Sequence, residues 1–334
     1  MKRHVLMVLT LAGSFLFYTG CSSKEGYKTI TGVAMGHSFK IVYKVPPYAP
    51  TTFSSDIKRA LNKHIQEIDK SISLYYKSSI LNQINSNLSV ETDSIFSTVF
   101  LKAKEVAAHT GAALNITSRP LQELWGYNLI NYETVTEEEI QNVLPYIGFH
   151  KIHLKDGIIS KEHPHIHINF NTLGVGLSAD HFADMLRSYH VTNFMIEIGE
   201  VVVCQGVNPS EAPWRIQLKQ AADNVLYLKD KSISAHGSPL NLNVKGKKVY
   251  NHLFDTKTGY PAEDPLISVV VISESSLMAS AYSLAFFSMG LDKSIQFLES
   301  HSNLQAILFY YKDDRLEIFT TSNITPRHET LYFP

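Results

Sequence analysis

The chain has 334 residues, of which 44% are hydrophobic and 18% are charged, and its formal net charge is −1. This composition excludes a disordered chain, and the near-zero charge gives no electrostatic basis for binding nucleic acid. The length allows one large domain or two.

The first elements along the chain are a targeting segment and a processing site. Basic residues precede an apolar run, 5–17, which is too short to span a bilayer as a helix. Small residues then lead to Cys21, an order typical of a bacterial lipoprotein. We therefore expect residues 1–20 to be a signal peptide and 21–28 to be a lipidated cysteine with its tether. The alternative is an ordinary secretory signal with an incidental cysteine. A lipidated Cys21 would hold the protein on a membrane of the cell envelope, facing the periplasm or the outside.

The rest of the chain, 29–334, mixes helical and strand patterns without a repeating βαβ order, which predicts an α+β fold. Expected strands cover 29–43, 193–206, 214–218, 225–233, 268–273, 304–311 and 316–320, and expected helices cover 56–72, 94–109, 121–125, 137–144, 177–189 and 277–289.

Two features of the chain have both a functional and a structural interpretation. His163, His165 and His167 alternate, so on a strand they would share one face, as a metal site or as an ordinary solvated face. The second interpretation is favoured. Cys204 lies in an apolar run and is expected to be a buried strand residue, not a nucleophile. With Cys21 lipidated it has no disulfide partner.

The densest group of reactive side chains lies between residues 249 and 261. His252, Asp255 and Thr258 occur within seven residues, and a turn at Gly259 follows. Such a segment reads as a strand running into a tight loop, and loops on a rigid scaffold commonly carry function. The alternative is a strand and turn whose charges are simply hydrated.

Seven stretches, in order, resemble one family over nearly the whole mature chain. That family is the ApbE family, the FAD:protein FMN transferases. The stretches are TGVAMGHSFKIVY (31–43), SLYYKSSILNQIN (73–85), GAALNITSRPLQELWGY (111–127), INFNTLGVGLSAD (168–180), FMIEIGEVVVCQG (194–206), NHLFDTKTGYPAE (251–263) and LMASAYSLAFFSMG (277–290).

The resemblance implies a single compact domain, related to the T-fold, with mixed or antiparallel sheets and a ligand cleft. It implies cleavage of FAD and transfer of FMN to a Thr or Ser of an exported partner protein, assisted by Mg²⁺. His252 and Asp255 are the implied catalytic residues. The implied metal positions are Gly174, through its carbonyl, Ser280 and Leu284. The implied flavin-binding residues are Met35, Tyr75, Tyr76, Thr117, Trp125, Glu200, Ala235, His236, Gly237 and Thr258.

This chain departs from the family pattern mainly where the family carries charge. Ser280 replaces an Asp, Leu284 replaces a Thr and Val175 replaces a Lys. An ion is disfavoured beside such apolar groups. Three hypotheses remain open. The first is an active transferase with a remodelled site, in which Glu200 and Asp255 could rebuild a metal site. The second is a relative that binds flavin or a partner protein without transfer, and the third is a structural protein without a ligand. Smaller departures from the pattern occur at Asn115, Asn169, Glu200 and His236.

Overall fold

The computed structural model describes eight stretches of the chain, and for residues 243–245, 248–253, 325–327 and 330–332 it describes the backbone only. The described stretches are 26–126, 131–218, 225–237, 243–245, 248–313, 315–322, 325–327 and 330–332. Cys21 and residues 1–25 lie outside them. Among the described helices, none is long and apolar enough to cross a membrane.

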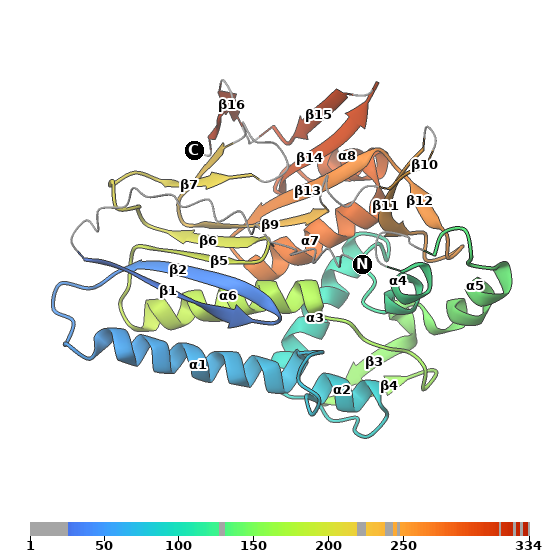
Figure 1. Cartoon of the computed structure of the whole chain (residues 1–334), viewed down its shortest axis with the longest axis horizontal. Helices are drawn as coiled ribbons and strands as arrows, with labels where there is room; N and C mark the ends of the chain where they lie inside the picture. The colour runs from blue at the N-terminus through green and yellow to red at the C-terminus, as the bar shows by residue number, and fades with distance from the viewer. Residues whose placement is uncertain are drawn as a thin grey trace, which may run out of the picture.

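The centre of the fold is an eight-stranded antiparallel sheet with the order β1-β2-β5-β6-β9-β13-β14-β15 (Figure 1). Its strands are β1 (Tyr27–Ala34), β2 (His37–Lys44), β5 (Phe194–Ile198), β6 (Val201–Gln205), β9 (Lys231–Gly237), β13 (Leu266–Ser273), β14 (Gln305–Lys312) and β15 (Arg315–Thr320). The pairs β1–β2, β5–β6 and β14–β15 are hairpins, whereas β13 and β14 are joined through two helices. The connection from β2 to β5 contains most of the helices, and the candidate site takes residues from the connections β2 to β5, β9 to β13 and β13 to β14.

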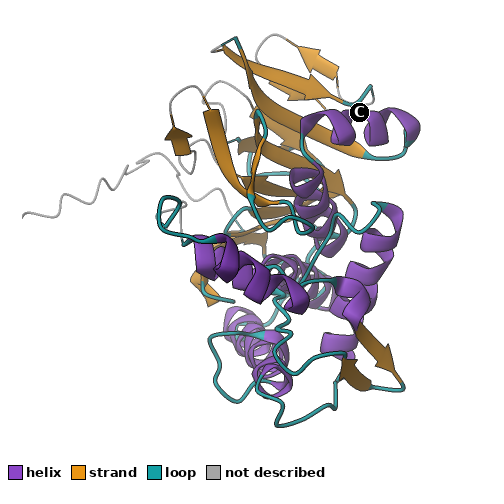
Figure 2. Cartoon of the chain, turned by 90° about the vertical axis from the view of Figure 1, so that its right-hand side faces the viewer, coloured by secondary structure: helices purple, strands orange, loops and turns teal. Residues whose placement is uncertain are grey.

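Helices gather on one side of this sheet, as Figure 2 shows. The helix α6 packs against α1 and α7, and α7 lies directly on β9 and β13. The helices are α1 (Phe53–Ile72), α2 (Ile80–Asn85), α3 (Ser94–His109), α4 (Arg119–Trp125), α5 (Glu137–Val143), α6 (Asn171–Ser188), α7 (Ser276–Met289) and α8 (Leu291–Ser300), with the 3-10 turns η2 (Leu144–Tyr146) and η3 (Phe149–Lys151).

The helices α6 and α7 approach closely because Gly176 has no side chain. A Cβ at this position would lie 2.5 Å from Ser280 Oγ and 2.6 Å from the carbonyl oxygen of Ser276. Those separations are too short for real atoms, so only glycine allows this contact between the two helices.

The sheet separates two apolar cores. Val269 and Val271 of β13 belong to the main core under the helices, whereas Val270 and Ile272 belong to a second core on the other face. A strand covered on both sides is buried at successive positions, which explains the continuous and mostly apolar run of buried residues in β13. The second core is covered by a four-stranded sheet, β16 (Thr325–Arg327), β17 (Thr330–Tyr332), β8 (Val225–Leu228) and β7 (Trp214–Gln217), in which β17 and β8 are parallel.

A third, smaller apolar cluster joins α4 and α5 to the loop after β11. Leu121, Trp125, Ile140 and Ile147 form its buried centre, and Phe254 packs against it. The remaining strands are the hairpin β3 (Ile152–Lys155) and β4 (Ile158–Lys161) and the three-stranded sheet β10 (Asn243–Lys245), β11 (Lys248–Phe254) and β12 (Pro261–Glu263). The α+β prediction with mixed and antiparallel sheets is confirmed.

Several predicted boundaries need correction. The single strand expected over 193–206 is a hairpin, because Gly199 takes φ 56 and the chain turns between β5 and β6. The strand expected over 225–233 is likewise two strands, β8 and β9. Residues 163–167 are irregular, so the three histidines do not share a strand face. His163 and His165 instead pack against the Tyr146 ring, the first tilted and the second edge-on, at centroid distances of 4.6 and 5.1 Å.

Candidate functional site

Two adjoining cavities open between α4, α6, α7 and the loop after β11. Their volumes are about 590 and 540 Å³. Both are within the range of small-molecule sites. Of the residues that the structure describes, six line both cavities, and we call them the waist of a joined cleft: Asn115, Ser118, Gln122, His236, Phe254 and Leu284.

One wall of the first cavity is the exposed face of α4. Arg119, Gln122 and Glu123 line it, together with Gly126 just after the helix. Their spacing of three, four and seven residues places them on one helical face. Arg119 Nε and Glu123 Oε1 are 2.6 Å apart, and both residues of this ion pair line the cavity. These residues were not predicted from the sequence, although their spacing was a signal that could have identified them.

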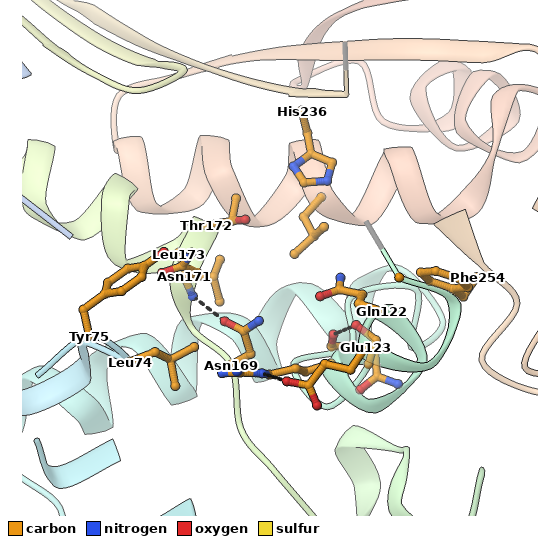
Figure 3. Close-up of a pocket in the computed structure, with 15 residues that line it drawn as sticks. Leu74, Tyr75, Gln122, Glu123, Asn169, Asn171, Thr172, Leu173, His236 and Phe254 are labelled. Carbon is orange, nitrogen blue, oxygen red and sulfur yellow. Dashed lines mark hydrogen bonds and ion pairs between the residues drawn. The ribbon is translucent and has the colours of Figure 1, made fainter. Parts of the chain in front are cut away.

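Two asparagines shape the floor of the first cavity through turns. Asn115 Oδ1 accepts hydrogen bonds from the backbone N (3.0 Å) and hydroxyl (2.7 Å) of Thr117. The Thr117 hydroxyl also accepts from Gly148 N at 2.7 Å, so the fully buried Thr117 supports the cavity from behind. Asn169 Oδ1 accepts from Asn171 N at 2.8 Å and fixes the start of α6 (Figure 3).

The predicted flavin-binding residues near β1 occupy different environments. Tyr75 is 65% exposed and lines the first cavity, where its ring lies over the turn at Gly36. Tyr76 is also exposed, but it does not line the cleft. Met35 is 1% exposed, and its terminal methyl group fills the space beside Gly174. Tyr75 is therefore the aromatic group of this set that can contact a ligand directly.

The loop from Asp255 to Tyr260 is held in place by backbone contacts. Asp255 N donates to the carbonyl of Tyr260 at 3.0 Å, and Gly259 N donates to the carbonyl of Asp255 at 2.7 Å. Buried Trp125 donates from Nε1 to the carbonyl of Gly259 at 2.8 Å. Asp255 and Lys257 line the second cavity, whereas Thr258 is exposed and does not line it.

The outer side of this loop is tied to α5. The Tyr260 hydroxyl donates to a carboxylate oxygen of Glu137, which lowers the pKa of Glu137 and raises that of Tyr260. His252 lies earlier, on β11, and its side chain is outside the described part of the chain.

The strand β9 divides its predicted residues between two faces. His236 projects into the waist, and Figure 3 shows it across the cavity from Asn169 and Gln122. Ala235 points the opposite way and lines a separate cavity of about 290 Å³ with Glu200. Gly237 follows with φ 83, and a Cβ there would lie 2.3 Å from the carbonyl oxygen of Ile267. Of this predicted group, His236 is the side chain that reaches the cleft.

The side chains at the implied metal positions do not fit Mg²⁺. Ser280 is fully buried and donates to Ser234 Oγ at 3.1 Å. The carbonyl of Gly174 accepts from the Ser178 hydroxyl at 2.7 Å. Leu284 presents an alkyl group to the cleft. Mg²⁺ prefers carboxylate, phosphate and water oxygens, and these three positions supply no carboxylate. Within the described residues, no cluster of three or more His, Cys, Asp or Glu could hold a metal.

Asp264 is the most buried carboxylate lining the second cavity, and hydrogen bonds from the backbone fix its position. One of its oxygens accepts from the backbone N of Leu266 at 2.9 Å and from that of Leu291 at 3.1 Å, which joins β13 to the start of α8. Burial raises the pKa of this carboxyl above its ordinary value. The second cavity also contains Asp255, Lys257, Asp292 and Lys293, so it is polar where the first cavity is more apolar.

The structure thus brings Tyr75, His236, Leu284 and Asp255 to one cleft. It buries Met35, Thr117 and Trp125 behind the walls, where they support neighbouring segments. It places Glu200 and Ala235 at a different cavity, and Ser280 in the contact between helices.

Comparisons with known proteins agree with this architecture. The FAD:protein FMN transferase of Vibrio cholerae serotype O1 is 24% identical over 329 residues, covering 95% of this chain and 98% of that protein. The solved structure of flavin transferase ApbE from Vibrio cholerae aligns with a TM-score of 0.79 and 24% identity, over 89% of this chain and 97% of that one. The apo flavinyl transferase ApbE of Pseudomonas stutzeri gives a TM-score of 0.79 and 21% identity, over 89% and 95%. A model of the ApbE family matches residues 35–308, and because this match spans most of the chain, the protein belongs to the ApbE family.

Proposed function

We propose that this protein binds FAD in the joined cleft, as a flavin-nucleotide-binding member of its family. The observation that carries the proposal is the pair of adjoining cavities that meet at the waist. A dinucleotide has two bulky halves joined by a narrow linker, so it matches two cavities joined at a waist. Tyr75, Leu74 and Phe254 offer apolar surface to a ring system.

The first candidate for the fate of the bound FAD is transfer of FMN to a Thr or Ser of an exported acceptor protein. The curated relatives carry the name FAD:protein FMN transferase, and the loop from Asp255 to Tyr260 is held rigidly beside the cleft.

The second candidate is retention of FAD, or of a partner protein, without metal-dependent transfer. The specific observation is that the Gly174 carbonyl and the side chains of Ser280 and Leu284 include no carboxylate, and that the Gly174 carbonyl and the Ser280 hydroxyl already form internal hydrogen bonds. A phosphoryl transfer that relies on Mg²⁺ needs oxygen ligands to hold the ion. We favour this candidate, because these side chains argue against a bound ion. A metal site rebuilt from Glu200 and Asp255 has little support, since the two residues line different cavities.

One experiment separates the two candidates. The full chain, purified in detergent, is mixed with FAD, MgCl₂ and a candidate acceptor domain, and mass spectrometry then measures FMN adducts and released AMP. Tight FAD binding without an adduct supports retention, whereas an adduct that requires Mg²⁺ establishes transfer. Absence of FAD binding would contradict both transfer and the retention of FAD.

We also propose that the protein is anchored to the cell envelope through a lipid on Cys21. The apolar run followed directly by a cysteine supports this. Mass spectrometry of the N-terminal peptide should show an acylated cysteine, and Cys21→Ala should release the protein from the membrane fraction. An unmodified Cys21 within an intact N-terminus would contradict the proposal.

A further inference from the structure

The waist of the cleft contains one ionisable side chain among the described residues that form it. Asn115, Ser118 and Gln122 are neutral and polar, and Phe254 and Leu284 are apolar. The remaining member is His236, which projects from β9 into the space between the cavities (Figure 3). Any charge supplied by the waist itself therefore comes from this imidazole.

The backbone and ring of His236 are both held by neighbours. Its carbonyl accepts a hydrogen bond from the Ser268 hydroxyl at 2.9 Å, and the residue pairs with Val269 across the sheet. Its ring meets the Phe287 ring edge to face, with centroids 5.0 Å apart and an interplanar angle of 71°. The imidazole is thus oriented from a rigid element and not from a loop, which favours a defined contact with a ligand.

The covalent structure of FAD places its pyrophosphate between its two halves. If the flavin half occupies one cavity and the adenosine half the other, the pyrophosphate passes the waist in either orientation. A pyrophosphate carries negative charge, and a protonated imidazole donates a charge-assisted hydrogen bond to such a group. Imidazole also changes charge between pH 5 and 8.

Other charged groups face the cleft from the elements around His236. Arg119 on α4 is paired with Glu123 at 2.6 Å, so its charge is partly neutralised. The described residues of the second cavity include more carboxylates than ammonium groups. An anion would therefore bind weakly there unless a further cation were present. Among the described residues, the charged groups that line the two cavities are Arg119, Glu123, Asp255, Lys257, Asp264, Asp292 and Lys293.

We propose that His236 binds the pyrophosphate of FAD at the waist, and that its protonation strengthens FAD binding. This inference rests on the proposed FAD binding and adds the residue and the part of the ligand that meet. A protonated His236 thereby supplies positive charge at the waist. The residues at the implied metal positions do not fit Mg²⁺, which would otherwise supply that charge.

The test measures dissociation constants by titration calorimetry at pH 5.5 and pH 8 on the full chain in detergent. The ligands are FAD, riboflavin, which lacks phosphate, and inorganic pyrophosphate. The variants are His236→Asn, His236→Lys and the control His153→Asn, which changes an exposed histidine on β3. For the unaltered protein we expect FAD, whose doubly esterified pyrophosphate keeps its charge over this range, to bind about tenfold more tightly at pH 5.5, and riboflavin to bind equally at both values. Free pyrophosphate itself gains charge between these values, so its binding is compared between variants at each pH.

His236→Asn should abolish the pH dependence of FAD binding. His236→Lys should give tight FAD binding at pH 8. Either variant alone tests the inference if the other does not fold. An unchanged pH dependence in both His236 variants, or the same dependence for riboflavin, overturns the inference. Pyrophosphate binding that depends on His236 without any FAD binding would support the anion contact and reject the proposed function. Absence of binding by both ligands rejects both.

Discussion

The carboxylate of Asp180, on α6, accepts a hydrogen bond of 2.8 Å from the hydroxyl of Ser275, the residue that caps α7. It also accepts from the backbone N of Ser276 at 2.7 Å and of Leu277 at 3.0 Å. Free N–H groups at a helix start favour a negative partner. Asp180 therefore sets where α7 begins, and α7 carries Leu284 into the cleft.

Asp180→Ala should lower the free energy of unfolding by about 2–3 kcal/mol, because several hydrogen bonds to a charged group are lost together. Urea denaturation followed by circular dichroism measures this change. The control is Asp184→Ala on the same helix, whose side chain is 74% exposed and pairs with Arg187; it should cost less than about 1 kcal/mol. Equal effects of the two substitutions would contradict the assigned role of Asp180.

Two glycines of α6, Gly176 and Gly174, provide a matched pair of substitutions that tests the contact between α6 and α7. Gly176→Ala would place a methyl group against the backbone carbonyl of Ser276, which cannot move independently, and should cost about 2–3 kcal/mol. Gly174→Ala meets the flexible tip of Met35 at 2.5 Å and should cost less. Thermal unfolding of both variants measures the difference, and a larger loss for Gly174→Ala would show that the helix contact is misassigned.

Ser280→Asp should destabilise the protein by about 3 kcal/mol, because it places a carboxylate where a fully buried hydroxyl now contacts Ser234.

The double substitution of Ser280→Asp with Leu284→Thr also recreates two oxygen ligands. Addition of Mg²⁺ should then raise the melting temperature of the double variant and leave that of the unaltered protein unchanged. The same measurement on Ser283→Asp, which alters a neighbouring buried serine outside the implied metal positions, is the control for a general effect of charge. If Mg²⁺ stabilises the unaltered protein equally, the interpretation of these positions is wrong.

The pair His64 and His181, on α1 and α6, predicts a loss of stability in acid. Their rings meet edge to face with centroids 5.9 Å apart. Burial, and then the charge of His64, lower the pKa of His181 below its ordinary value, against the opposing effect of Asp184, Asp180 and Glu67. The folded state therefore favours the neutral imidazole. This contribution to stability is present above the unfolded pKa of about 6.5 and is lost as the pH falls through the lower folded value.

His181→Gln should accordingly flatten the decline in stability between pH 7 and pH 5. Urea midpoints across this range measure it, and His153→Gln, at an exposed position, should retain the full decline. An identical pH profile for His181→Gln and the unaltered protein would count against this assignment.

Trp125→Phe should loosen the loop from Asp255 to Gly259, because the carbonyl of Gly259 loses its buried donor. We expect a loss of about 1–2 kcal/mol, faster amide exchange in this loop and weaker FAD binding. The control is Trp214→Phe, which removes a similar bond to the carbonyl of Gln205 on the far side of the sheet. It should reduce stability without faster exchange in the loop; exchange that rises equally in both variants would show that Trp125 does not hold the loop specifically.

Much of the fold could be predicted from local sequence patterns, whereas the site depended on long-range placement. The expected helix 94–109 matches α3, since Asp93 caps its start and Gly111 follows its end. The cleft residues on α4 were missed, because polar residues on a short helix look like ordinary surface until α6 and β9 are packed opposite. Ala235 directly precedes His236 of the cleft in the chain, yet strand alternation turns Ala235 to the other face of the sheet, where it lines a separate cavity with Glu200.

Because β13 is packed on both faces, it acts as a partition between two compartments of the molecule. Val269 and Val270 are neighbours in the chain, but they belong to separate cores. The cleft borders the helical compartment, and the layer of β7 and β8 encloses the other. Substitutions in that outer layer can therefore accumulate without disturbing the cleft. The extent of sequence divergence in the outer layer says little about the chemistry of the cleft.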